Sequence, residues 1–291
     1  MATKTYIANP IIFFVIIPLL AIVRVSVVSA NGGPHDGTIA DSTNCALCHR
    51  SNTISDVQQM PMQEVTTLCL SCHGTGLGAN TNVVDGIYIA GNDNHRYDEG
   101  VINTPDGAPL LGGGFVTYLG KPVSSSHGTF NENSSTRGNI TAHSINCISC
   151  HNPHGSANYR GLREHINGHM VSVAQVDEGL QKDYDTENWG QDVDSLCIAC
   201  HDGYDSDSNR AIPNRHTHRV GMSYSDGHNK NPETIGYKNY HLPLAESGAG
   251  DVVVCMTCHL PHGTSATMSN GNDSNLLRLD NSGVCQVCHQ K

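Results

Sequence analysis

Residues 147–156 read CISCHNPHGS, and residues 255–264 read CMTCHLPHGT. Both segments open with the pattern Cys-x-x-Cys-His and continue with Pro-His-Gly after one further residue. Two stretches this similar, far apart in one chain, indicate an internal repeat. We therefore expect one domain built from repeated units, because neither unit is long enough to bury a core alone.

The pattern Cys-x-x-Cys-His occurs six times in the 291 residues and uses all 12 cysteines. Two thiols on one turn can form thioether bonds with the two vinyl groups of a porphyrin, and the adjacent histidine can then bind the iron. We expect six covalently attached c-type haems. The residues concerned are Cys45, Cys48 and His49; Cys69, Cys72 and His73; Cys147, Cys150 and His151; Cys197, Cys200 and His201; Cys255, Cys258 and His259; Cys285, Cys288 and His289.

Other sites also use closely spaced cysteines, namely zinc ribbons, thioredoxin-like redox centres and disulfide frameworks. None of these sites requires a histidine directly after the second cysteine. Because the histidine is present in all six copies, haem attachment is favoured over the three alternatives.

Residues 1–30 have the features of an export signal. Lys4 precedes 13 uncharged apolar residues, 11–23 (IIFFVIIPLLAIV), and residues 28–30 (VSA) match a small-x-small cleavage site. The apolar run ends at Arg24 and is shorter than the roughly 20 residues of a membrane-spanning helix. We expect cleavage after Ala30 and an exported protein, extracellular, at the cell surface or periplasmic, without a stable membrane span. A retained N-terminal anchor is the alternative.

The mature chain would comprise residues 31–291 as one hexahaem cytochrome c domain, with haem doublets at 45–73, 147–201 and 255–289. Outside the signal, the large aromatic residues other than tyrosine are Phe115, Phe130 and Trp189. Such a chain supplies little core material, so we expect it to wrap around the row of haems. The 30 glycines and 12 prolines favour a mostly irregular, loop-rich fold with short α-helices and little β-structure. Helices are expected at 62–73, at 194–201 with Asp194 or Ser195 as N-cap, and at 282–289.

The mature chain is acidic, with 14 basic against 27 acidic residues, a net charge of −13. This charge excludes nucleic acid as a partner. A solvated acidic surface is favoured over the steering of a cationic partner. The expected partners are redox proteins or extracellular electron acceptors, together with further copies of the chain in a homopolymer.

Twelve histidines lie outside the motifs, twice the number needed to give six irons a second axial ligand. The set we favour comprises His35, His127, His154, His218, His241 and His262, with His95 and His143 in reserve. His165, His169, His216 and His228 are expected on the surface or near haem propionates. His154 and His262 follow a motif histidine by three residues, too close to cross its own haem. We expect each to bind a neighbouring haem; the alternative is that they cap turns beside Pro153 and Pro261.

The order of these features resembles that of doubled-CXXCH multihaem cytochromes, in particular the extracellular hexahaem cytochromes that form conductive filaments in metal-reducing bacteria. The resemblance rests on His35, on GGGFVTY at 112–118 with His127 after it, on CISCHNPHGSANYR at 147–160, on CIACHDGY at 197–204, on His218 and His241, on CMTCHLPHG at 255–263 and on the terminal CQVCHQK. It implies bis-histidine haems in a continuous row of alternately stacked and perpendicular pairs.

The resemblance also bears on assembly. In that family a histidine three positions after the first motif's histidine binds a haem of the adjacent subunit, and here that position is Asn52. His35 could take over this role and lead to an open fibre. Alternatively, His35 binds a haem of its own chain and the protein is a monomeric carrier.

Electron transfer is the function we expect. The alternative is a multihaem reductase of the nitrite or hydroxylamine type, which needs one haem with an open coordination position. All six motifs are regular, and the sequence shows no nucleophile or paired carboxylates with recognisable spacing. These features favour a protein that is not an enzyme.

Overall fold

The computed structural model describes residues 35, 48, 62–74, 79–89, 106–128, 145–174, 189–201, 220–224, 242–247 and 250–289. Several sequence predictions fall elsewhere in the chain and are therefore outside the described residues. They concern the signal segment 1–30, Cys45, His49, Asn52, His95, His143, His216, His218, His228 and His241.

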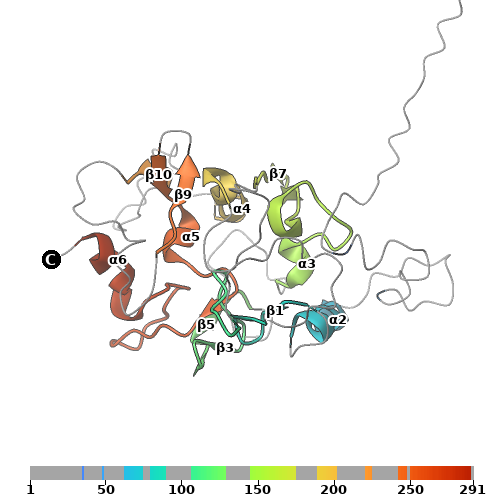
Figure 1. Ribbon diagram of the computed structural model, residues 1–291, viewed down its shortest axis with the longest axis horizontal. Coiled ribbons are helices and arrows are strands. Elements are labelled where there is room, and N and C mark those ends of the chain that lie inside the picture. Colours follow the sequence, from blue (N-terminus) through green and yellow to red (C-terminus); the bar gives the residue numbers. More distant parts are fainter. Residues whose placement is uncertain are drawn as a thin grey trace, which may run out of the picture.

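Five α-helices in the described part of the chain each contain the first cysteine of a motif. These helices are α2 (Met62–His73), α3 (Cys147–Cys150), α4 (Asp194–Ile198), α5 (Cys255–Cys258) and α6 (Gly283–Cys288). They follow one another along the longest axis of the molecule in sequence order, from α2 on the right to α6 on the left (Figure 1). The chain therefore presents motifs two to six as a row. None of the helices in the described ranges is long and apolar enough to cross a membrane.

The sequence analysis predicted three of these helices, of which α4 and α6 are shorter than the predicted 194–201 and 282–289, and it mistook one capping role. The predicted helix at 62–73 is confirmed by α2. The predicted cap of α4 was wrong, because Val193 occupies the N-cap position. Asp194 instead accepts a hydrogen bond from the backbone N–H of Cys255 (2.7 Å), and Ser195 Oγ donates to the carbonyl of Ser172 (2.9 Å). Both side chains thus link α4 to segments distant in sequence.

The strands of the described residues are two to four residues long and pair only antiparallel. Such short ladders position loops rather than form a core. The pairs are β1 (Thr81–Asn82) with β2 (Ile87–Tyr88), β3 (Thr117–Tyr118) with β4 (Lys121–Pro122), β5 (Ser125–Ser126) with β11 (Gly263–Thr264), β6 (His165–Ile166) with β7 (His169–Met170), and β10 (Gly250–Val253) with both β8 (Met222–Ser223) and β9 (Ala245–Ser247).

The pairing of β5 with β11 joins two segments that both flank predicted ligands. Ser126 lies opposite Gly263, so His127 and His262, the neighbours of these two residues in sequence, are brought to one place. Gly113 forms a bridge to Gly263 from the other side. The loop after the fifth motif is therefore held between two segments more than 100 residues upstream.

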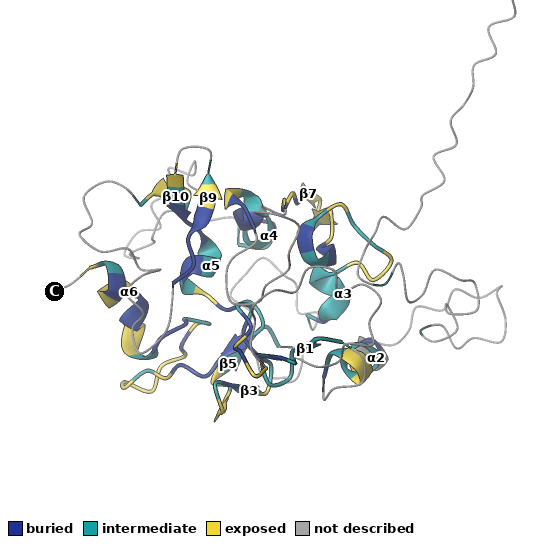
Figure 2. Cartoon of the chain, in the orientation of Figure 1, coloured by how far each residue is buried: buried dark blue, intermediate teal, exposed yellow. Residues whose placement is uncertain are grey.

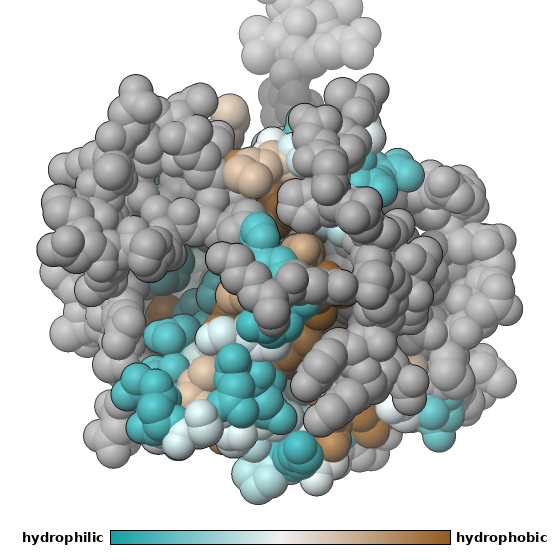
Figure 3. Space-filling view, turned by 90° about the vertical axis from the view of Figure 1, so that its left-hand side faces the viewer, coloured by the Kyte–Doolittle hydropathy of each residue, from teal (hydrophilic) through white to brown (hydrophobic). Residues whose placement is uncertain are grey.

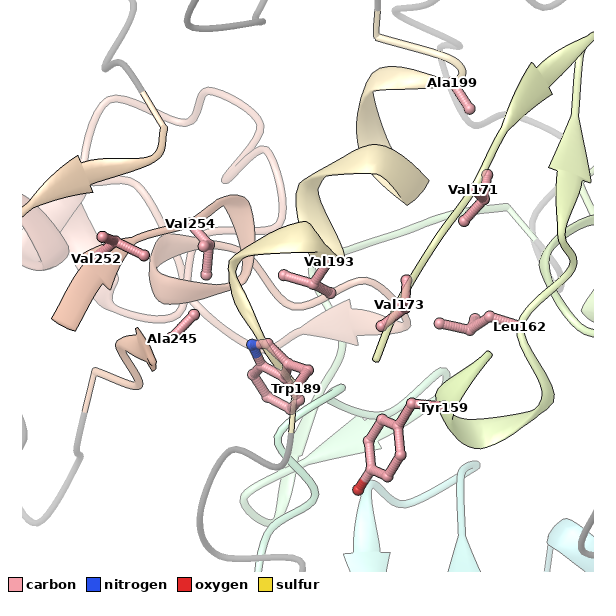
Figure 4. Close-up of a cluster of buried hydrophobic side chains, with 10 residues drawn as sticks. All are labelled: Tyr159, Leu162, Val171, Val173, Trp189, Val193, Ala199, Ala245, Val252 and Val254. Atoms are coloured by element: carbon pink, nitrogen blue, oxygen red, sulfur yellow. The ribbon is translucent and has the colours of Figure 1, made fainter. Parts of the chain in front are cut away.

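The largest buried apolar cluster connects motifs three, four and five. Figure 4 shows Val193, which precedes α4, between Val254 on the side of α5 and Val173 on the side of the third motif. Trp189 and Tyr159 extend the cluster across the same region. Because burial of one such side chain contributes about 1.5–3 kcal/mol, this cluster is the main apolar link between the three motifs.

Burial is graded across the structure. Figure 2 shows buried residues in β10 and at the start of α4, whereas the motif helix α3 is mostly intermediate. Of the described cysteines only Cys72 and Cys285 are exposed, and the others are half-buried. At the α6 end of the molecule, apolar residues lie in the middle of the face with hydrophilic residues below them (Figure 3).

Candidate haem-binding site

Each described motif from the third to the sixth closes one helical turn. The backbone N–H of its histidine donates to the carbonyl of its first cysteine, at distances of 2.7–3.0 Å. A polar residue starts the turn of the third motif: Asn146 Oδ1 accepts from the N–H of Ser149 (3.1 Å), and Ser149 Oγ accepts from the N–H of Asn146 (3.1 Å). This reciprocal capping stabilises a helix too short to persist alone. Two thiols and one imidazole are thereby gathered on a single turn.

Backbone carbonyls determine which nitrogen of the motif histidines can bind a metal. The Nδ1 atom of His151 lies 3.1 Å from the carbonyl oxygen of Arg160, and that of His259 lies 2.8 Å from the carbonyl oxygen of Asn275. A carbonyl oxygen only accepts, so each Nδ1 must carry the hydrogen. The lone pair is then on Nε2, which is the arrangement of metal-binding histidines.

Two of the predicted second ligands are held in the same way. His35 Nδ1 lies 3.1 Å from the carbonyl oxygen of Pro153, and His127 Nδ1 lies 2.5 Å from that of Pro261. The two prolines occupy equivalent positions in the repeated segments that begin at Cys147 and Cys255. Each repeat thus orients a histidine from elsewhere in the chain.

Three predicted second ligands lie opposite a motif histidine. The ring centroids are 6.0 Å apart for His35 and His73, 6.3 Å for His127 and His201, and 6.4 Å for His262 and His151. Two imidazoles on opposite sides of one metal have centroids about 6 Å apart, since each metal–nitrogen bond is about 2.0 Å and the centroid lies about 1 Å behind the nitrogen. All three separations therefore fit one iron between two histidines.

His262 has the environment of a neutral ligand. Its Nδ1 atom is buried without a hydrogen-bond partner among the described residues, and the ring of Phe115 packs against it with centroids 4.8 Å apart. Burial, reinforced by the nearby His151, lowers the pKa of His262 to about 3. The backbone of Gly113 opposes this shift in part. His262 thus keeps a lone pair for a metal.

The triple glycine at 112–114 forms the wall behind His262. The N–H of His262 donates to the carbonyl of Gly112 (2.8 Å), and a Cβ on Gly112 would lie only 3.0 Å from His262 Nδ1. Gly113 has φ +83°, and a Cβ there would lie 2.0 Å from the carbonyl oxygen of Gly263. The loop can approach the histidine this closely because it carries no side chains.

The histidine pairs lie next to one another. Burial, together with smaller effects of His35 and His151, lowers the pKa of His73 to about 4, so the second and third motifs are neighbours. His259 is exposed, yet desolvation by the surrounding protein lowers its pKa, with Arg278, His201 and His127 adding to the shift. The fourth and fifth motifs are therefore also neighbours.

Contacts between cysteines of different motifs place the motifs in the same order. The thiols of Cys69 and Cys147 share a hydrogen bond, which lowers the pKa of Cys147 to about 7, and those of Cys197 and Cys255 share another. These two junctions join motif two to three and motif four to five through their first cysteines.

The remaining junctions use other cysteines. Burial raises the pKa of Cys150 to about 12 and of Cys258 to about 11. The cysteines of motif four add to the first shift, and those of motif six add to the second, which Arg278 opposes in part. Cys48 lies near Cys69. Every motif thus neighbours the next one in sequence, and two kinds of junction alternate between motifs two and six.

One pair of functional residues escaped the sequence analysis. Arg163 and Arg278 occupy equivalent positions. The backbone N–H of each donates to the carbonyl oxygen of the second cysteine of the adjacent motif, Cys150 at 2.8 Å and Cys258 at 2.9 Å. The buried Arg278 also donates from Nε to the carbonyl of Met256 (2.9 Å). The dipeptide Leu-Arg, at 162–163 and 277–278, is the sequence signal that could have identified them.

Three further histidines of the described residues, His154, His165 and His169, are exposed. His154 is exposed, and its backbone N–H donates to Asn152 Oδ1 (3.1 Å). His165 and His169 are exposed on the β6–β7 hairpin. In the described ranges, no group of three or more His, Cys, Asp and Glu side chains is arranged to hold a metal ion.

The chain was compared with known proteins, and no family model, no curated protein and no solved structure matches it.

Proposed function

We propose that the chain is an electron-transfer protein with six covalently attached bis-histidine c-type haems, similar to the extracellular multihaem cytochromes. The observation that carries the proposal is the set of three histidine pairs with centroids 6.0–6.4 Å apart, each joining a motif histidine to a second histidine. Each bound haem would supply one-electron redox chemistry.

The ligands can be assigned partly by geometry and partly by the repeat. His73 pairs with His35, His201 with His127 and His151 with His262. His262 belongs to the fifth motif's segment and reaches back to the third motif.

Applied to the third motif's segment, the same relation assigns His154 to His49 of the first motif. His218 and His241 are then the proposed ligands for the haems of His259 and His289, in an order that the repeat does not specify.

The side chains keep their sites ready for ligation without a proton transfer. Hydrogen bonds from Nδ1 to backbone carbonyls hold the rings of His151, His259, His35 and His127 in one tautomer. Low pKa values keep His73 and His262 neutral. Two histidines on one iron leave no open position, which favours electron transfer over the reductase alternative.

The raised pKa values of Cys150 and Cys258 are unlike those of a redox-active dithiol, and the lowered pKa of Cys147 has its cause in Cys69 of another motif rather than in its own motif partner. In such centres a depressed pKa provides the reactive thiolate. Burial instead raises the pKa of Cys150 and Cys258, the second cysteines of their motifs. Thioether attachment requires no stable thiolate in the finished protein.

We further propose that the protein is exported and exchanges electrons with redox proteins or extracellular acceptors. The position of His35 beside His73 favours the alternative in which His35 binds a haem of its own chain. A homopolymer would then need a contact other than His35.

Spectroelectrochemical titration of the native protein tests this function. We expect six electrons per chain, rapid reoxidation by a soluble ferric chelate, and no consumption of nitrite or hydroxylamine. Turnover of either compound, together with one high-spin haem per chain, would instead support the reductase.

A further inference from the structure

Two junctions in the row of motifs are built alike. The residue three positions before the first cysteine of motif two is Thr66, and its hydroxyl hydrogen-bonds to Cys147 of motif three. The residue three positions before the first cysteine of motif four is Asp194, which accepts from the N–H of Cys255 in motif five (2.7 Å). Each of these side chains therefore ties its own motif to the next one.

The two junctions differ in charge. Thr66 and Asp194 are 5% and 6% exposed, so neither group is well solvated. Thr66 is neutral, whereas Asp194 carries a carboxyl group. Burial raises the pKa of Asp194, and the hydrogen bond from the backbone N–H of Cys255 opposes that rise and favours the ionised form. A buried charge acts strongly on its neighbours because little water screens it. This carboxylate interacts with Cys255, which in turn contacts Cys197 of motif four.

Other acidic side chains near α4 are engaged differently. Asp192, two residues earlier, is half-buried, and its Oδ2 accepts from the N–H of Ala174 (2.9 Å). Glu246 in β9 is exposed and belongs to the strand that bridges to Gly190. Among the acidic residues of this region in the described ranges, Asp194 is the one hydrogen-bonded to a motif cysteine.

This inference rests on the proposed haem attachment. We propose that Asp194 is a positioning residue that fixes the junction between the fourth and fifth haem-attachment turns and lowers the reduction potential of at least one haem attached there. Oxidation of a haem removes one electron and adds one positive charge to the site. A nearby negative charge stabilises the oxidised form, so it lowers the potential. The neutral Thr66 has no such effect at the equivalent junction, and the row is therefore electrostatically uneven.

The test is Asp194→Asn, which removes the charge but retains an oxygen that accepts from the N–H of Cys255. Haem content is measured by mass, spin state by electron paramagnetic resonance, and potentials by spectroelectrochemical titration at one pH. We expect six low-spin haems and a shift of one or two components to higher potential. The expected size is at least a tenfold change in the reduction equilibrium, or 59 mV for a one-electron couple.

Two control variants separate this effect from others. Asp192→Asn removes the same charge two residues away, and Thr66→Val alters the equivalent junction without changing charge. Neither variant is expected to raise the reduction potential of any haem by about 59 mV. A purely structural role for Asp194 would leave the potentials of an Asp194→Asn protein with six low-spin haems unchanged.

The outcomes distinguish this inference from the proposed function. An unchanged titration in six-haem Asp194→Asn, or an equal shift in Asp192→Asn, overturns the inference alone. A wild-type protein without six haems overturns the proposed function and the inference with it. If Asp194→Asn binds fewer haems, Asp194→Thr introduces the residue found at the equivalent junction, and an absence of any positive shift in that variant also overturns the inference.

Discussion

A histidine binds a metal only through an unprotonated nitrogen, and this chain determines which nitrogen that is. Carbonyl oxygens of Arg160 and Asn275 engage Nδ1 of two motif histidines, His151 and His259. A carbonyl cannot donate, so Nε2 remains available. In metal sites such outer hydrogen bonds also fix the orientation of the ring. The proposed ligation can therefore be tested by replacing single histidines.

Replacing His262 should affect one haem only. His262→Ala removes the imidazole opposite His151, so we expect the haem at Cys147 and Cys150 to become high-spin while the other five remain low-spin. Electron paramagnetic resonance of the oxidised protein measures this change. His169→Ala, which removes an exposed histidine, is the control and should change nothing. Six low-spin haems in His262→Ala would show that the assignment is wrong.

His154 should serve a different haem from His262. Because it lies three residues from His151, His154→Ala is expected to make one haem other than the His151 haem high-spin. The double variant with His262→Ala should then contain two high-spin haems. A single high-spin haem in the double variant would mean that both residues serve the same site, contrary to the repeat relation.

The glycine loop at 112–114 packs directly behind the predicted ligand His262. It packs against Gly263 and the back of His262, where side chains would collide. The pairing of β5 with β11 closes the other side. These elements contain few apolar residues, so their role is to position the ligand rather than to supply core.

Adding one methyl group to this loop should destabilise the protein. In Gly113→Ala the new Cβ would lie 2.0 Å from the carbonyl oxygen of Gly263, in addition to the strain of φ +83°. Gly120→Ala is the control, because its φ is +70° and nothing lies within 4 Å. We expect Gly113→Ala to lose about 1–3 kcal/mol more than Gly120→Ala in denaturant unfolding. Equal losses would contradict the close packing of the loop.

For the molecule as a whole, the sequence predicted what is local and missed what depends on distant segments. The helix at 62–73 was predictable because the motif it carries needs one regular turn. The sequence analysis favoured His35, His127 and His262 among the 12 histidines outside the motifs, but no local pattern indicated which motif each would face. Asp194 was interpreted as a cap of its own helix, whereas its partner Cys255 comes from another motif.

The placement of His35 leads to a prediction about assembly. His35→Ala should make the haem of His73 high-spin within each chain, because the two rings lie 6.0 Å apart in one molecule. The hydrodynamic mass of the protein should not change. Loss of polymers that the wild type forms would instead identify His35 as a ligand between subunits.

We propose that six haems are attached to one chain and that each has two histidine ligands. Intact mass spectrometry of the native exported protein, combined with its electron paramagnetic resonance spectrum, tests this claim most directly. We expect the mass of residues 31–291 plus six haems and an entirely low-spin spectrum. A mass corresponding to fewer haems, or a stoichiometric high-spin signal that binds carbon monoxide, would contradict it.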